Sequence, residues 1–407
     1  MPVSDPIGPV RTTAAATLTS VIGTMPVFLV GSQGGFLRES LQIDPAQLGA
    51  ALAMFMVASA VCSPVGGRIP ELIGSGRSLV LVCLGSGAVM MSLALFVSTH
   101  THLMVALALG GCWNSMSLPA SNLALARGVA GRPAFVFGVR QSAVPLAAML
   151  AGASVPLVSS GVGWRWSFAL GSLLAVVVAT YVPWSLTPAQ PRGVMRFRIR
   201  DGVNPPLLLL GLALFAGSAA SISLGTFLVE ATTARGFSAH TAGWLQVIGS
   251  LMGIATRLTM GWLADRHRGT ALQMMAGMLA VGAGGFILLG SATRLIPLAI
   301  GALLAFGPGW GWNGLLMFAT VRMNPDTPAT ASGLLGVGGA GGAALGPLVF
   351  GYIATRTSYE MAWYVCAAFA LVAAVLAVAA RTWAIRDRMR QANGRIQFVH
   401  PGSDGGS

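Results

Sequence analysis

The chain of 407 residues is 55% apolar and only 9% charged, whereas a soluble domain carries about 25% charged residues. Too little polar material remains to cover a soluble core, so the bilayer has to solvate most of the surface. The net charge of +13 comes from 24 basic residues, all of them arginine. Because these arginines lie in short segments between apolar runs, they indicate membrane topology and argue against a nucleic-acid partner.

Twelve apolar runs reach the length of about 20 residues that a membrane-spanning helix requires. In chain order they are 14–36, 47–66, 78–98, 102–126, 134–159, 165–186, 205–229, 240–263, 270–290, 295–320, 328–354 and 361–381. The first run lacks a convincing cleavage site, so we interpret it as a retained span. The predicted fold class is an all-α membrane protein with twelve transmembrane helices in two six-helix bundles.

A polar, arginine-rich segment divides the runs six and six, as expected of a join between two bundles. The predicted domains are an N-terminal bundle over 1–186, a cytoplasmic linker over 187–204, a C-terminal bundle over 205–382 and a cytoplasmic tail over 383–407.

Arginine placement predicts the orientation. Seventeen of the 24 arginines fall on the side of the two termini, five fall on the opposite side, and Arg140 and Arg257 fall within spans. By the positive-inside rule, both termini are cytoplasmic in a multi-pass protein of the cell inner membrane.

Three landmarks recur in the second half at nearly one offset. Gly67 to Glu71 is matched 194 positions later by Gly261 to Asp265, and Trp113-Asn114 is matched 199 positions later by Trp312-Asn313. Gly138 is matched 195 positions later by Gly333. This pattern predicts a duplicated unit of six spans.

The second copy of the first landmark, Gly261-Trp-Leu-Ala-Asp265-Arg266-His-Arg268, resembles the loop signature of the major facilitator superfamily. The first copy, Gly67-Arg-Ile-Pro-Glu71-Leu-Ile-Gly74-Ser-Gly-Arg77, departs from it with Glu71 for Asp and Leu72 where a basic residue is common. The resemblance covers almost the whole chain and implies a secondary transporter that works by alternating access around a central site. It implies a gating role for Gly67, Glu71, Arg77, Gly261, Asp265, Arg266 and Arg268.

That gating role has a physical basis. Gly261 allows two helices to approach closely, and Asp265 can accept from a helix N-terminus or an arginine. The alternative is that Asp265 is a solvated loop acid.

Arg140 and Arg257 are the charged residues predicted to lie within spans. A charge there costs about 2.5–3.5 kcal/mol, so both are expected to face a water-filled cavity. Two guanidinium groups, with Gln141 beside the first, suit a carboxylate or another oxyanion. The alternative for Arg257 is a gate residue paired with a backbone carbonyl or an acid.

The two Trp-Asn pairs are candidate walls of the substrate site. Asparagine supplies a donor and an acceptor, and tryptophan supplies a flat face with one donor. Trp113, Asn114, Trp312 and Asn313 are therefore predicted to enclose the substrate, with Gln33 and Gln246 as weaker candidates. The alternative is interhelical packing with asparagine as the polar contact.

Several absences narrow the function. No acidic residue falls deep in a predicted span, which disfavours proton coupling through a buried carboxylate, although Glu230 would serve if the seventh span extended further. The fourth span lacks the arginine of many drug–proton antiporters of the resembled superfamily, and the fifth has Val144-Pro145 where these tend to have Gly-Pro. Multidrug or metabolite efflux is therefore the second choice.

Enzyme motifs and nucleotide-binding loops are absent, so we expect neither catalysis nor a cofactor. The four cysteines show no metal-ligand spacing and are expected to be buried apolar residues. Gly338, Gly342 and Gly346 form a smooth helix face suited to sliding or to static packing. The predicted function is transport of a small organic solute, with an anion favoured, by a monomer in the lipid bilayer. A channel or a non-transporting sensor remains the further alternative.

Overall fold

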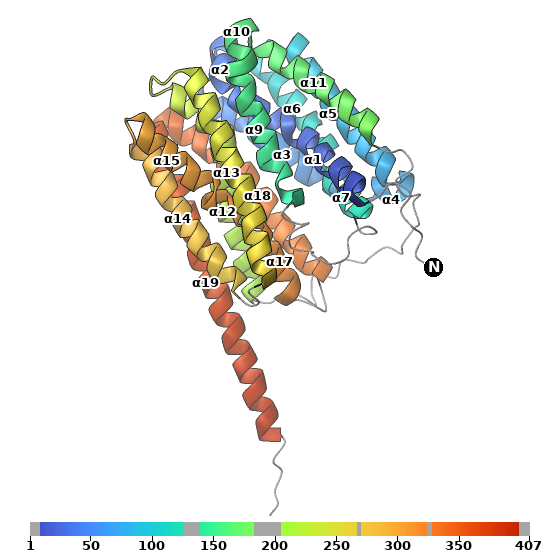
Figure 1. The fold of residues 1–407 in the computed structure, drawn as a ribbon, viewed down its shortest axis with the longest axis vertical. Coiled ribbons are helices and arrows are strands. Elements are labelled where there is room, and N and C mark those ends of the chain that lie inside the picture. The colour runs from blue at the N-terminus through green and yellow to red at the C-terminus, as the bar shows by residue number, and fades with distance from the viewer. Residues whose placement is uncertain (1–8, 126–138, 183–204, 267–269, 324–327, 399–407) are drawn as a thin grey trace, which may run out of the picture.

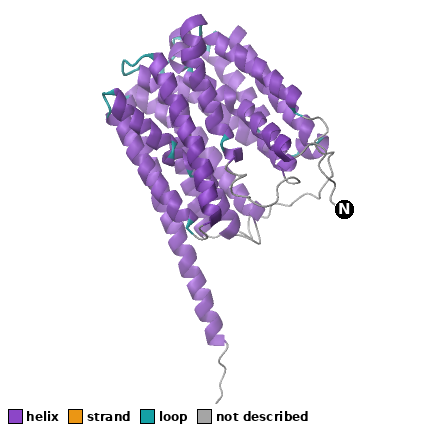
Figure 2. Cartoon of the chain, viewed as in Figure 1, coloured by secondary structure: helices purple, strands orange, loops and turns teal. Residues whose placement is uncertain are grey.

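The computed structural model describes residues 9–125, 139–182, 205–266, 270–323 and 328–398, and every regular element in these ranges is a helix (Figure 2). The first half contains α1 Pro9–Ser32, α2 Gly34–Leu41, α3 Pro45–Gly66, α4 Ile69–Ile73, α5 Ser75–Phe96, α6 His100–Asn114, α7 Ser117–Leu125, α9 Ala143–Ser154, the π-helical turn η1 Val155–Ser159, α10 Ser160–Val162 and α11 Trp164–Tyr181. The second half contains α12 Pro205–Thr233, α13 Ala239–Arg266, α14 Ala271–Ser291, α15 Leu295–Phe306, α16 Pro308–Gly311, α17 Asn313–Met323, α18 Pro328–Arg356 and α19 Tyr359–Phe398.

Twelve segments of the described chain are long and apolar enough to cross a membrane, which confirms the predicted fold class. Each overlaps one predicted span. Helix α19 continues to Phe398, whereas the prediction ended the twelfth span at 381. Helix α12 continues through Glu230 to Thr233, whereas the prediction ended the seventh span at 229. The helix continues because Glu230 has an arginine partner, described below. The domain boundaries stay predictions, and the linker 187–204 lies outside the described residues.

With twelve spans, α1 begins and α19 ends on one face, called here the terminal face, and the opposite side is the far face (Figure 1). Glycines near the far face bring helices of the two bundles together. Gly49 of α3 lies against the Pro347 backbone of α18, and Gly31 of α1 lies against the Thr226 backbone of α12. Gly152 of α9 approaches the backbone of Gly243 in α13 in the same way. These backbone approaches close the far face.

Toward the terminal face the same helices become exposed. On α3, Leu52 and Phe55 are fully buried, whereas Val61 is 72% exposed and Val65 is 65% exposed. On α13, the exposed positions are the separate residues Trp244 and Ile248 near the far face, and they become more frequent at Leu251, Met252, Ala255 and Thr259. Exposure on these two helices, which belong to different bundles, therefore increases toward the terminal face.

The fourth and tenth spans are interrupted at the Trp-Asn pairs. Helix α6 ends at Asn114 and α7 begins at Ser117, while α17 begins at Asn313 after the short α16. The tenth span also turns at Gly307, which caps α15. Both related spans thus have irregular backbone near the centre of the protein, which membrane helices tolerate where protein or a cavity surrounds them.

The glycine-rich eleventh span packs on α12 within its own bundle. A Cβ on Gly338, Gly342 or Gly346 would meet the backbone of Gly211, Phe215 or Ala219, respectively. The constant four-residue step on both helices gives one continuous seam, continued by the stacked rings of Phe227 and Phe350, whose centroids are 4.6 Å apart. This arrangement favours static packing for this glycine face.

We expect Gly342→Ala to lower the unfolding midpoint of the detergent-solubilised protein, because the new methyl group would meet the backbone carbonyl of Phe215. Overpacking of this kind costs about 1–3 kcal/mol. Gly336→Ala is the matched control, since nothing lies within 4 Å of a Cβ at that position of the same helix. Equal unfolding midpoints for the two variants would contradict close packing of these glycines against the α12 backbone.

Candidate functional site

Arg257 of α13 is only 2% exposed. One terminal nitrogen donates to the Gly253 carbonyl at 3.0 Å, and the other donates to the Trp310 carbonyl at 2.6 Å. The guanidinium also lies 5.4 Å from the centroid of the Trp310 ring, a cation–π distance. Its Nε has no hydrogen-bond partner among the described residues. Carbonyl dipoles and an aromatic face thus solvate this charge without neutralising it.

Arg140 lies at a similar depth on the opposite bundle. Helices α9 and α13 run antiparallel, and a Cβ on Gly152 would lie 2.9 Å from the Gln246 side chain. Arg140 is twelve residues before Gly152, and Arg257 is eleven residues after Gln246. At 1.5 Å per residue, both arginines lie about 17 Å from that contact toward the terminal face.

The environment of Arg140 is only partly closed. Its side chain is half-buried, and its inaccessible Nε has no hydrogen-bond partner within the described ranges. The α9 helix that follows contacts the other bundle, since the Ala148 carbonyl accepts from Gln246 of α13 at 3.1 Å. Gln141 itself lies just before α9, from which a turn at Ser142 separates it.

The two tryptophans of the Trp-Asn pairs are not brought together. Trp113 is 36% exposed and covers Gly85 of α5, whereas Trp312 is fully buried and covers Gly217 of α12. The Trp312 Nε1 donates to the Gly309 carbonyl at 2.9 Å. Both rings fill the space over a glycine in a neighbouring helix, so neither enters the site proposed below.

The two asparagines lie at the helix interruptions. Asn114 donates to the Ser59 hydroxyl at 3.2 Å, and its Oδ1 would lie 2.9 Å from a Cβ on Gly23 of α1. Asn313 is half-buried, and its inaccessible Oδ1 is without a hydrogen-bond partner in the described part of the chain. It follows Trp310, the carbonyl partner of Arg257, by one helical turn. Each asparagine therefore adds a polar group to its own bundle.

Hydroxyl groups that the sequence did not single out gather near Asn114. The Ser20 Oγ of α1 lies 3.3 Å from the Oγ of Ser117 and 3.3 Å from that of Ser121, both in α7. Serines are common in membrane helices, so their sequence positions gave no signal; only the packing of α1 on α7 brings these three together.

Gln33 and Gln246 are both fully buried near the far face. Gln246 of α13 donates to the Ser32 hydroxyl at 2.9 Å and to the carbonyls of Ala148 and Gly225, each at 3.1 Å. Gln33 donates to the Ser154 hydroxyl at 2.9 Å. Gln246 thereby joins both bundles at the far face, whereas the Gln33 bond lies within the N-terminal bundle.

An aromatic contact lies between this closure and Arg257. Phe28 of α1 and Trp310 of α16 come from different bundles, and their ring centroids are 6.0 Å apart. A Cβ on Gly225 would touch both rings at 2.7 Å, so glycine is required there. The sequence analysis missed Phe28 and Trp310, because an apolar aromatic residue in a membrane span is unremarkable by itself.

A charged network joins the bundles at the far face. The Arg38 Nη1 donates to the Glu230 Oε1 at 2.8 Å and to the Tyr359 hydroxyl at 3.0 Å. The Tyr359 hydroxyl in turn donates to Glu230 Oε1 at 2.6 Å. Glu230 is 1% exposed, and its Oε2 has no hydrogen-bond partner among the residues that the structure describes. This three-residue network links α2 with α12 and α19.

The predicted gating residues lie at the terminal face. Gly67 caps α3, and the side chains of Glu71 and Arg77 are exposed on α4 and α5. Gly261 is half-buried, and five residues later Arg266 lies over the ring of Trp262, 3.7 Å from its centroid. Arg268 and the side chain of Asp265 lie outside the described residues. The gating role of this set stays a prediction.

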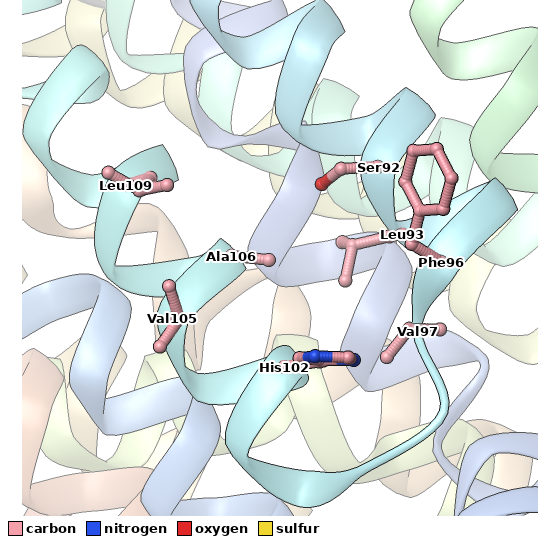
Figure 3. Close-up of a pocket in the computed structure, with 8 residues that line it drawn as sticks. All are labelled: Ser92, Leu93, Phe96, Val97, His102, Val105, Ala106 and Leu109. Carbon is pink, nitrogen blue, oxygen red and sulfur yellow. The ribbon is translucent and has the colours of Figure 1, made fainter.

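The pocket in Figure 3 is peripheral. It lies between α5 and α6, has a volume of about 210 Å³ and is lined by Ser92, Leu93, Phe96, Val97, His102, Val105, Ala106 and Leu109. Phe96 is 70% exposed and Val105 is 54% exposed on the outside of the bundle. An apolar hollow on a lipid-facing surface is not a central substrate site. In the described residues, no cluster of three or more side chains could hold a metal ion.

Comparisons with known proteins agree with this architecture. The family model described as Major Facilitator Superfamily matches residues 7–321 and 207–398. A crystal structure of a mutant of the nucleoside transporter NupG aligns with a TM-score of 0.68 at 15% identity, covering 90% of this chain and 99% of that chain. At that identity the likeness shows the fold. No curated protein matches the sequence. Because the family model spans nearly the whole chain, this twelve-span membrane protein is a transporter that belongs to the Major Facilitator Superfamily.

Proposed function

We propose that the chain is an alternating-access carrier of a small organic anion. The observation that carries the proposal is a pair of arginines, one on each bundle. Arg140 lies just before α9 and Arg257 lies in α13, at similar distances from the contact between Gly152 and Gln246. Neither forms an ion pair in the described chain, where the recorded ion pair is Arg38 with Glu230. Two uncompensated cations at one depth favour a solute that brings its own negative charge.

Contacts between the bundles near the far face, together with the greater exposure of α3 and α13 toward the terminal face, support a role for this pair in occlusion. A carboxylate held between two guanidinium groups gains charge-assisted hydrogen bonds from both sides. Since Arg140 and Arg257 belong to different bundles, these bonds favour approach of the bundles at the terminal face. The solute thereby shifts the carrier toward an occluded state, because it binds that state more tightly. Asn114, Asn313 and Gln141 would hold the uncharged part.

The membrane and its sidedness are part of the same proposal. The arginine distribution supports a cell inner membrane with both termini in the cytoplasm. In that orientation the closed far face is external, and the carrier is open to the cytoplasm. We propose that it functions as a monomer.

A second candidate is a neutral polar solute. The hydroxyls of Ser20, Ser117 and Ser121, with the amide of Asn114, offer donors and acceptors without charge. The fold neighbour named as a nucleoside transporter makes nucleosides a reasonable test of this class.

The first experiment measures thermal stabilisation of the purified protein against small carboxylates, nucleosides and lipophilic cations. A ligand that binds the native state raises the unfolding midpoint. We expect a rise with one or more carboxylates, reduced at least about tenfold in apparent affinity by Arg140→Gln or Arg257→Gln, since a charged hydrogen bond contributes about 1.5–3 kcal/mol.

Matched controls separate the two arginines from general charge effects. Arg294→Gln removes an exposed arginine at the far face and should leave the response to carboxylates unchanged. A response to nucleosides alone would replace the anion by a neutral solute, and a response to lipophilic cations alone would favour multidrug efflux. Either result would return Arg257 to the role of a gate residue bound to the Trp310 carbonyl.

A further inference from the structure

Two of the four cysteines lie side by side across a helix pair. The Sγ of Cys62 in α3 and the Sγ of Cys112 in α6 are 3.0 Å apart. Both are partly buried free thiols, whereas Cys83 and Cys366 are buried. The Cys83 thiol lies 3.6 Å from the Thr19 hydroxyl. The juxtaposition of Cys62 and Cys112 was not evident from the sequence, where the two are fifty residues apart.

The backbones at this point are close enough for a covalent link. A Cβ on Gly111 would meet the Phe55 carbonyl, and a Cβ on Gly66 would meet Ser115, so close approaches lie on both sides of the cysteines. A disulfide requires an S–S bond of about 2.05 Å and Cα atoms about 4.4–6.8 Å apart. A shift of about 1 Å in the sulfurs, within reach of side-chain rotation, completes the bond.

We propose that Cys62 and Cys112 form a reversible dithiol–disulfide pair that takes its oxidising equivalents from a low-molecular-weight disulfide. The sulfur of one cysteine attacks a sulfur of R–S–S–R, which breaks that bond and releases R–S⁻, and this takes up the proton of the attacking thiol. The second cysteine then attacks the mixed disulfide, expels the other R–S⁻, and gives it the second proton. Two thiols are oxidised to one disulfide, and R–S–S–R is reduced to two R–SH.

The link would act on the polar groups of the N-terminal bundle. The hydrogen bond between Asn114 and Ser59 lies beside the cysteines, two residues after Cys112 and three residues before Cys62. The same place is the interruption of the fourth span, between Asn114 and Ser117. Oxidation would therefore hold the C-terminal end of α6, next to this interruption, against α3, and reduction would release it.

The test treats the reduced, full-length protein in detergent with oxidised glutathione. We expect loss of two of the four free thiols, a Cys62–Cys112 linked peptide after proteolysis, and full recovery with dithiothreitol. In Cys62→Ser the remaining Cys112 should carry one glutathione, and in Cys112→Ser the remaining Cys62 should do so. Cys83 and Cys366 serve as internal controls and should stay unmodified.

Two outcomes would overturn the proposal. One is that Cys62 and Cys112 both remain alkylatable after treatment and that the variants Cys62→Ser and Cys112→Ser also take up no glutathione. The other is that the unaltered protein carries glutathione on both cysteines without a linked peptide. Because thiols and peptides are measured directly, neither outcome depends on knowing the transported solute.

Discussion

Arg38→Met is expected to lower the stability of the protein by about 3 kcal/mol at neutral pH, because it leaves a buried carboxylate without its cation. Glu230 is 1% exposed, and its ion pair with Arg38 connects the two bundles. Tyr359 donates a hydrogen bond to the same carboxylate oxygen, and a neutral hydroxyl compensates only part of the lost charge. The measurement is the unfolding midpoint in detergent.

Variants of Glu230 test whether the loss of stability comes from the unpaired carboxylate. Glu230→Gln should cost less, since Arg38 is 29% exposed and can turn to water. The double variant Arg38→Met/Glu230→Gln should recover most of the stability that Arg38→Met loses. In Arg38→Met, the loss should also shrink at acid pH, because the carboxyl can then bind a proton and become neutral.

Arg294→Met is the control for removing an arginine at the far face, because that side chain is exposed. If Arg294→Met lowered the unfolding midpoint as much as Arg38→Met, the proposed role of the ion pair would be contradicted. So would a double variant that is no more stable than Arg38→Met.

Gly49→Ala is expected to separate the bundles at the far face. A Cβ there would meet the Pro347 carbonyl oxygen and lie 3.4 Å from the Gly351 Cα, all backbone that cannot rotate away. The Ala46 amide reports on this contact, because it donates across the bundles to the Thr355 hydroxyl at 2.9 Å. With an overpacking cost of about 1–3 kcal/mol, its hydrogen exchange should accelerate about tenfold or more.

Gly35→Ala provides the matched control. Gly35 lies close to the other bundle, but the nearest atom to its Cβ position is the Thr233 hydroxyl at an ordinary 3.7 Å. Exchange of the Ala46 amide should be unchanged in this variant. Similar acceleration in both variants, or in neither, would mean that the Gly49 contact does not hold the far face closed.

The sequence predicted the fold well because span length and hydropathy are local properties. All twelve spans were found, and the family resemblance rested on a local motif. The end of the seventh span was missed because a carboxylate normally ends an apolar run. What allows Glu230 to stay inside α12 is Arg38, 192 residues away in sequence.

The candidate site was harder to predict, because the sequence does not say which helix face is directed to the centre. Trp113 and Trp312 have the same neighbour, asparagine, yet one ring is partly exposed over Gly85 and the other is fully buried over Gly217. Arg257 was located by the cost of its charge, whereas its carbonyl partner on Trp310 depends on how the tenth span bends at Gly307.

Helix α18 has two different neighbours on two of its sides. Gly338, Gly342 and Gly346 fix it to α12, while Gly351 near its far-face end lies against the Pro45 backbone of the other bundle. The helix is therefore packed both within the C-terminal bundle and against the N-terminal bundle. In the alternating-access mechanism proposed above, a rotation of the N-terminal bundle would therefore act through α18 on α12, the helix that bears Glu230. Substitutions at Gly338, Gly342 or Gly346 should accordingly alter the rate at which the far face opens, although these residues make no contact there.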